Sequence, residues 1–229
     1  MDRPQAPRNG AQPASRRPAA IVVAIALACA LLLGGCSSIL GGSPRDRVTT
    51  YAPDPRISAD PAWPAVTWQL AIVPPTSARW TDSLRIAVRP TPGELQVYKG
   101  ANWAKPPTVM IEDAILRGLE DSGRIPAVAR QASGISADYR LIMDLRRFEA
   151  DYAGAAVPSA VIELNAMLLH RVDQQVVSSR TFLSKQVAAS TAIPDVAAAF
   201  DPALGDIAKQ VAGWTLTEGA VHDHSHRQP

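Results

Sequence analysis

The chain of 229 residues has a formal net charge of +2 and a pI near 8.7, but its basic residues are unevenly distributed. Residues 1–35 contain four arginines and one aspartate, so the remaining 194 residues carry 19 basic and 20 acidic side chains, a formal net charge of −1. The high pI thus comes from residues 1–35 and is no argument for a nucleic-acid partner, which would require a basic stripe on the folded part. Both cysteines lie near the N-terminus, so the rest of the chain has no thiol for a disulfide, a zinc cluster or a nucleophile.

The N-terminal stretch has the pattern of a bacterial export signal. Arginines precede a 15-residue apolar run, residues 19–33, and the run ends at Leu33-Gly34-Gly35-Cys36. These four residues resemble a lipobox, which predicts that Cys36 is acylated and becomes the first mature residue. A transmembrane anchor is the alternative, but about 15 helical residues fall short of the roughly 30 Å hydrocarbon core.

Composition divides the rest of the chain into three parts. Residues 36–62 are rich in Ser, Gly, Pro and Asp without an apolar period, which predicts a lipid anchor and flexible tether. Residues 63–218 are expected to form one domain, and residues 219–229 a disordered, histidine-containing tail. Ser37 after the lipobox cysteine favours sorting to the outer membrane, with the inner membrane as the alternative.

The first half of the domain predicts strands followed by a helix. Strands are expected at residues 66–73, 83–90 and 94–99, the last two as a hairpin, and a short strand at 125–130. Residues 107–122 predict a helix, because apolar side chains recur every three or four residues while charged ones take the opposite side. A proline at its start and a glycine just after it fit helix termini.

The second half predicts an antiparallel meander and a closing helix. Alternating apolar residues over 138–187 indicate three strands, with an extra residue near Arg146 that forms a bulge and returns Phe148 to the buried side. Residues 194–216 predict helix, in which Asp201-Pro202 either starts a second helix or kinks a long one. The expected fold is a single α/β domain, a mixed sheet with an antiparallel meander covered by two main helices.

The sequence offers little catalytic chemistry. It contains neither a G-x-S-x-G elbow nor a phosphate-binding G-x-x-x-x-G-K-[ST] loop. His170 is expected to be a polar residue at a strand margin, and the carboxylate pairs Glu112-Asp113 and Glu149/Asp151 to lie on solvated faces. The H-x-H-x-H run of the tail would bind metal only weakly, because an unstructured tail preforms no site; the run comprises His222, His224 and His226. We therefore expect neither a metal nor a cofactor.

Two aromatic residues before the main helix are the candidate interface. Tyr98 and Trp103 flank a loop-like stretch between strand and helix. Trp brings a large apolar area with one donor, so it fills a core or an interface equally well. One interpretation has Trp103 closing the core; the other has both residues contacting a partner protein or a lipid.

The order of several motifs resembles the ABC-type transport auxiliary lipoprotein family, which includes the paraquat-inducible protein C type. After the lipobox and the proline-rich segment come R-I-A-V-R at 85–89, V-Y…W-A-x-P-P at 97–107, a helix ending in S-G at 115–123 and Y-R-L-I-M-D-L-R-R-F at 139–148. The resemblance covers residues 66–216, including Trp214 near the end of the closing helix. Asp201-Pro202 and the histidine tail depart from it.

The resemblance implies a non-enzymatic component of the cell envelope. Its expected partners are a periplasmic MCE-family protein with its ABC permease and ATPase, a machine that moves phospholipid or other hydrophobic molecules between inner and outer membranes. The chain would be held on the periplasmic face of the outer membrane through acyl chains on Cys36, and some relatives form rings, so a homo-oligomer is an expectation too. The alternatives are a lipoprotein of another envelope assembly, such as a secretion pilotin or a lipopolysaccharide-export component, and a lipid carrier or hydrolase acting alone.

Overall fold

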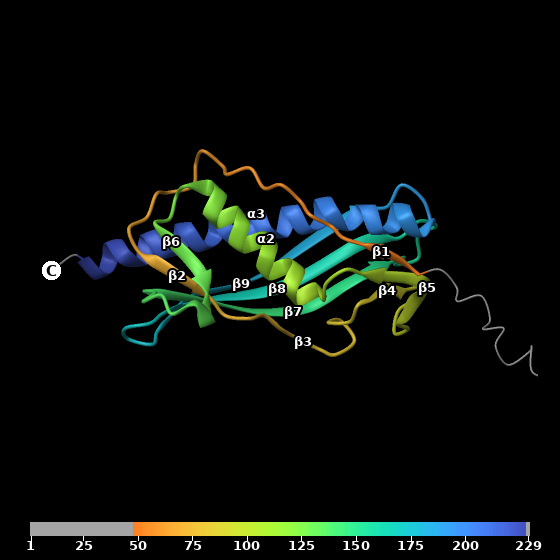
Figure 1. Ribbon diagram of the computed structural model, residues 1–229, viewed down its shortest axis with the longest axis horizontal. Coiled ribbons are helices and arrows are strands. Elements are labelled where there is room, and N and C mark those ends of the chain that lie inside the picture. Colours follow the sequence, from red (N-terminus) through yellow and green to blue (C-terminus); the bar gives the residue numbers. More distant parts are fainter. Residues whose placement is uncertain (1–47, 228–229) are drawn as a thin grey trace, which may run out of the picture. The chain divides into compact units, whose positions relative to one another are not determined.

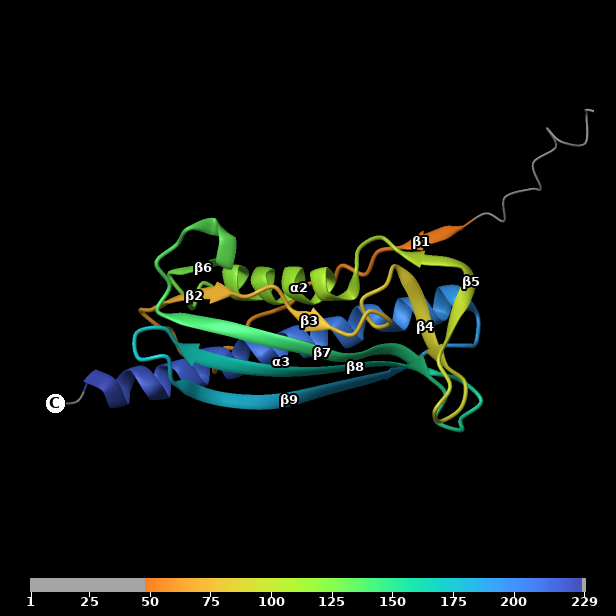
Figure 2. The same ribbon diagram turned by 90° about the horizontal axis from the view of Figure 1, so that it is seen from below.

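The computed structural model describes residues 48–227 as one compact unit. The predicted export signal and Cys36 lie outside these residues. The described part is a mixed α/β domain in which a curled sheet is covered on one face by two helices, as the sequence predicts (Figures 1 and 2). Neither helix in this part is long and apolar enough to cross a membrane.

The central strand of the sheet is β7 (Tyr139–Asp151), and it confirms the predicted meander. Strand β8 (Ser159–His170) pairs antiparallel along all of β7, and β9 (Val176–Val187) pairs antiparallel with β8. The register shifts by one residue between Leu145 and Arg147, which is the expected bulge. Phe148 beyond the bulge is only 1% exposed.

The other edge of β7 is shared by three short strands that follow one another along it. All three run parallel to β7: β2 (Gln69–Ile72), β3 (Thr76–Ser77) and β4 (Arg85–Arg89). Three further strands extend the sheet: β6 (Ala127–Arg130) beside β2, β5 (Gln96–Trp103) as the hairpin partner of β4, and β1 (Thr49–Tyr51) parallel to β5. A short 3-10 turn, η2 (Gln131–Ser133), follows β6.

The two helices pack on the same face of the sheet. Helix α2 (Pro107–Ser122) has the predicted bounds; it starts with a proline and stops at Gly123, whose φ of 62° is the left-handed conformation that glycine adopts without a side-chain clash. Helix α3 (Ile193–Arg227) is a single element with Pro202 inside it, so Pro202 does not divide it into two helices. Figure 2 shows α3 behind β7, β8 and β9, and α2 beside it, toward β2 and β3.

The predicted tether is wrong from Val48 onward, because this segment packs on the domain. After β1 the chain runs across the helices on the side away from the sheet (Figure 1). Ile57 lies so close to α2 that a Cβ added to Gly118 would be 3.1 Å from its Cδ1, and Pro55 approaches Gly205 of α3 in the same way at 3.2 Å. An extended segment that contacts helices through single apolar residues shows no apolar period in its sequence. Residues 48–62 therefore resembled a flexible linker.

The predicted disordered tail is also wrong over its described residues. Helix α3 continues to Arg227, well past Leu216, where the periodic apolar pattern ends. The extra turns lie beside the end of the meander, where the Tyr139 hydroxyl forms a 2.8 Å hydrogen bond with Nδ1 of His222. These contacts join distant parts of the chain, so the local sequence of the tail did not indicate them.

Candidate functional site

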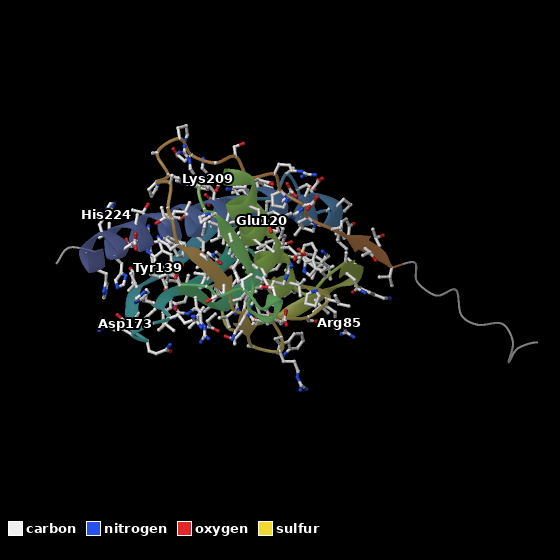
Figure 3. The ribbon with its side chains drawn as sticks, turned by 60° about the vertical axis from the view of Figure 1, so that its left-hand side comes forward. Arg85, Glu120, Tyr139, Asp173, Lys209 and His224 are labelled. Atoms are coloured by element: carbon white, nitrogen blue, oxygen red, sulfur yellow. The ribbon has the colours of Figure 1, made fainter. Side chains whose placement is uncertain are left out.

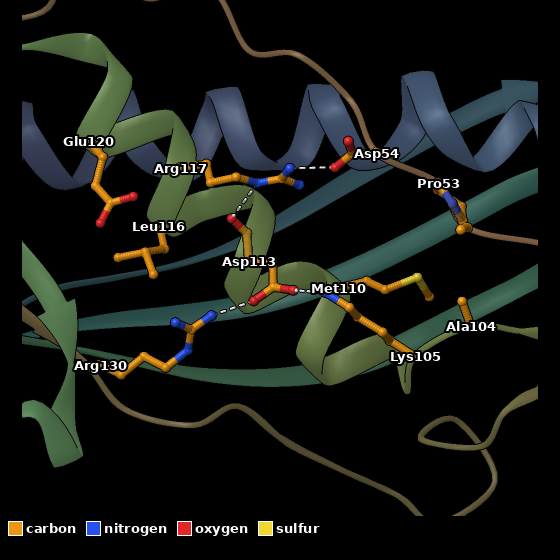
Figure 4. Close-up of a pocket in the computed structure, with 11 residues that line it drawn as sticks. Pro53, Asp54, Ala104, Lys105, Met110, Asp113, Leu116, Arg117, Glu120 and Arg130 are labelled. Carbon is orange, nitrogen blue, oxygen red and sulfur yellow. Dashed lines mark hydrogen bonds and ion pairs between the residues drawn. The ribbon is translucent and has the colours of Figure 1, made fainter.

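A charged groove of about 640 Å³ lies along the outer side of α2 (Figure 4). One wall is formed by residues 52–54, and the other by Arg130 at the end of β6. Met110 and Leu116 supply apolar surface to the groove, and each is less than 10% exposed. The loop at Ala104 and Lys105, which joins β5 to α2, closes one end.

Ion pairs occupy the groove. Asp113 lies in the middle and accepts hydrogen bonds from Lys105 Nζ, at 2.7 Å, and from Arg130. Arg117, one turn along α2, pairs with Asp54 and donates to the Asp113 carbonyl at 3.3 Å. The hydrogen bond from Arg117 holds the pKa of Asp54 below its usual range. The groove thus presents mutually neutralised charges on an apolar floor.

Glu112, beneath this network, is the one buried carboxylate of α2. Its side chain is 9% exposed and lies 3.2 Å from Arg130 Nε. Burial raises the pKa of Glu112; the charge of Arg130 opposes this shift, and that of Asp113 adds to it. The expected solvated carboxylate pair is therefore wrong for Glu112, which faces inward although its neighbour Asp113 faces the groove.

We expect Glu112→Gln to raise the free energy of unfolding at pH 7 by about 1 kcal/mol, because it removes a buried charge. In the wild type, the folded state binds more protons than the unfolded state from about pH 4.3 up to the raised pKa of Glu112, so its stability falls as pH rises through that window. The variant lacks this fall. Urea denaturation between pH 4 and 8 measures both curves, with the exposed Glu120→Gln as control. A variant less stable than wild type at pH 7 would contradict the argument.

The second carboxylate pair, Glu149 and Asp151, stabilises a strand junction. Glu149 is 5% exposed and accepts hydrogen bonds from Arg89 of β4, at 2.8 and 3.1 Å, and from Arg147 at 2.8 Å. Asp151 accepts a hydrogen bond from Arg147 at 2.5 Å. The hydrogen bonds from Arg89 to Glu149 raise the pKa of Arg89. The sequence prediction of a solvated pair missed this network, because Arg89 lies 60 residues away along the chain.

The two aromatic candidates lie in β5 and have different surroundings. Trp103 is 2% exposed and packs edge-on against Phe148 and Phe200, with ring centroids 5.7 and 4.9 Å away. The interface prediction is thus wrong for Trp103, and the core interpretation is the one the structure supports. Tyr98 is half-buried beside Tyr152, and burial raises the pKa of its phenol well above the usual value. A partner contact at Tyr98 stays a prediction.

Three histidines and Asp173 lie together where β8 ends and turns into β9. His170 ends β8, Asp173 lies in the following turn, and His222 and His226 reach them from α3. His224, exposed in the same helix, is not among them. Figure 3 labels Tyr139, Asp173 and His224 at this end of the domain. Burial lowers the pKa of His222, and the neighbouring histidines lower it further.

The described residues thus form one α/β domain whose candidate functional sites are a surface groove of paired charges and a histidine cluster. Its segment 50–212 matches the family of ABC-type transport auxiliary lipoprotein components. Because the match covers most of the chain, the chain belongs to this family. Membership assigns it to the lipoproteins of the cell envelope that assist ABC transport systems.

Three individual proteins are similar to this chain. The crystal structure of protein XCC0632 from Xanthomonas campestris is 54% identical, with 77% of this chain and 99% of that chain covered and a TM-score of 0.75. A crystal structure of an uncharacterized protein, 14% identical with a TM-score of 0.55, shares the fold; 72% of this chain and 97% of that chain are covered. The uncharacterized protein bll6063 from Bradyrhizobium diazoefficiens is 27% identical over 176 residues, 77% of this chain, which span only 47% of its length.

Proposed function

We propose that this chain is a non-catalytic, lipid-anchored accessory component of an MCE-type ABC transport system, one that moves phospholipid or other hydrophobic molecules between the inner and outer membranes. The observation that carries the proposal is the family match over residues 50–212. The groove along α2 supports it: its lining pairs each of Lys105, Arg117 and Arg130 with a carboxylate. Such a surface suits contact with another protein better than it suits acid–base chemistry.

In this proposal, the residue that attaches the chain to the membrane is Cys36. A single acyl chain gives only marginal membrane binding, at about 0.8 kcal/mol per buried methylene, whereas several chains hold a protein durably. We propose that acylated Cys36 holds the domain at the periplasmic face of the outer membrane, where the domain docks the periplasmic MCE subunit. Tyr98 remains a candidate contact for that subunit.

A crosslinked pull-down from native envelopes tests the proposal. We expect an MCE-family subunit to co-purify with the tagged full-length chain, and Cys36→Ala to reduce its recovery at least tenfold because the chain leaves the membrane. Cys29→Ala is the matched control, since Cys29 lies within the predicted signal, and it should behave as wild type. Mass spectrometry identifies the recovered proteins, and flotation of the membranes reports the anchoring.

Three outcomes would overturn the proposal. Recovery of secretion or lipopolysaccharide-export proteins in place of an MCE subunit would assign the chain to another envelope assembly. Recovery of bound lipid without any protein would indicate a carrier that acts alone. Equal membrane association of wild type and Cys36→Ala would contradict lipidation, whichever partner is recovered.

A further inference from the structure

We propose that His170, Asp173, His222 and His226 form a binding site for a divalent transition-metal ion of the zinc class. Each of the four residues offers one ligand atom, and these atoms all lie within 4.8 Å of one another. Ligands about 2.1 Å from a tetrahedral ion lie about 3.4 Å apart, so closure requires movements of little more than 1 Å. Three imidazoles and one carboxylate are a ligand set that suits Zn²⁺, Co²⁺ or Ni²⁺.

The hydrogen bonds of His170 and His222 indicate which of their nitrogen atoms can bind an ion. His170 Nδ1 lies 2.9 Å from Oδ1 of Asp173, so these two atoms can hold an ion between them once the ion replaces the proton of their hydrogen bond. His222 Nδ1 lies 2.8 Å from the Tyr139 hydroxyl, which is not one of the proposed ligands. When Nδ1 of His222 donates to that oxygen, Nε2 is the free atom. A carboxylate or hydroxyl that holds the second nitrogen is the usual support of a metal-bound histidine.

Asp173 lies between two of the histidines. Its Oδ1 accepts from His170 and from the backbone N–H of Gln175, at 2.9 and 3.0 Å. Its Oδ2 faces Nε2 of His226 at 3.5 Å, a separation that an ion between the two atoms would bridge. The backbone N–H of Gln175 therefore positions the Asp173 carboxylate before an ion binds, with a histidine facing each of its oxygens.

The arrangement differs from chelation by a histidine-rich tail. His222 and His226 are four residues apart, so they share one face of α3, whereas His224 is turned about 200° from His222. The remaining ligands come from β8 and its turn, about 50 residues earlier in the chain. The cluster therefore depends on the folded domain and excludes the middle histidine of the H-x-H-x-H run.

Titration with ZnCl₂ alone tests the site. The full-length chain, purified in detergent with a tag that contains no histidine and then stripped with EDTA, is titrated by calorimetry, and bound metal is counted by mass spectrometry. We expect one Zn²⁺ per chain. His170→Ala and His226→Ala should each weaken binding at least tenfold, and Asp173→Asn, which keeps the oxygen that Gln175 needs, at least fivefold. His224→Ala should bind within twofold of wild type.

The opposite pattern would overturn the proposal. If His224→Ala weakens binding as much as His226→Ala while His170→Ala has no effect, the metal is held by the tail sequence only. Absence of Zn²⁺ binding up to 1 mM would also end the proposal. A second readout guards against misfolded variants: excess Zn²⁺ should raise the Tm of wild type and His224→Ala by the same amount, and that of Asp173→Asn by less.

Discussion

Trp103→Ala should lower the free energy of unfolding by about 3–5 kcal/mol, the usual cost of removing a large aromatic side chain from a core. The indole contacts Phe148 of β7 and Phe200 of α3, and these two rings are themselves stacked with centroids 4.8 Å apart. The three rings join β5, the central strand and the closing helix. Their loss would leave a cavity where the hairpin meets α3.

Urea denaturation followed by circular dichroism measures this effect. Trp80→Ala is the matched control, because Trp80 is 55% exposed and its removal should change stability by no more than about 0.5 kcal/mol. Equal stability of the two variants, together with weakened partner binding by Trp103→Ala alone, would restore the interface interpretation of Trp103.

Gly219→Ala should also be strongly destabilising, with a loss of about 1–3 kcal/mol in the free energy of unfolding. A Cβ at this position would lie 2.3 Å from Cζ2 of Trp68, whose side chain is 3% exposed. Alanine gains about 1 kcal/mol over glycine in a helix, but this gain is smaller than the cost of displacing a buried indole. The absence of a side chain at Gly219 is what lets α3 approach the segment before β2.

Gly118→Ala provides the comparison for this experiment. Its added methyl would be tight only against Cδ1 of Ile57, at 3.1 Å, the end of a side chain that can rotate away; Cγ2 and Cβ of Ile57, at 3.5 and 3.6 Å, are at ordinary contact distance. We expect a change within about 0.5 kcal/mol by thermal denaturation. Combining Gly219→Ala with Trp68→Leu should recover part of the loss, since the two residues are in contact. Strict additivity of the two substitutions would show that the clash is absent.

The elements with a strong period were predictable from sequence. The bounds of α2, the three strands of the meander and the bulge before Phe148 all follow from where apolar residues recur. Residues 48–62 and the last turns of α3 were not predictable in this way, because they pack through single residues against distant elements. Only the three-dimensional fold brings Ile57 to Gly118, or His222 to Tyr139.

The candidate sites show the same division. Local sequence identified Tyr98, Trp103 and the histidine run as unusual, but it could not decide which side chains are buried. Trp103 is part of the core because β5 extends to this residue, whereas the strand was expected to end at residue 99 and a loop to follow. His170 resembled an isolated polar residue at a strand margin, because its neighbours in the cluster come from a turn and from the helix that closes the domain.

The packing of β1 against β5 determines how far the domain can stand from a membrane. If Cys36 carries the acyl chains, as we propose, 12 steps along the chain separate it from Val48, the residue before β1. Even fully extended, these 12 steps reach no more than about 40–43 Å at roughly 3.3–3.6 Å each. Under this proposal the start of the domain lies within about 43 Å of the lipid, so a partner based in the opposite membrane has to extend to that distance to meet it.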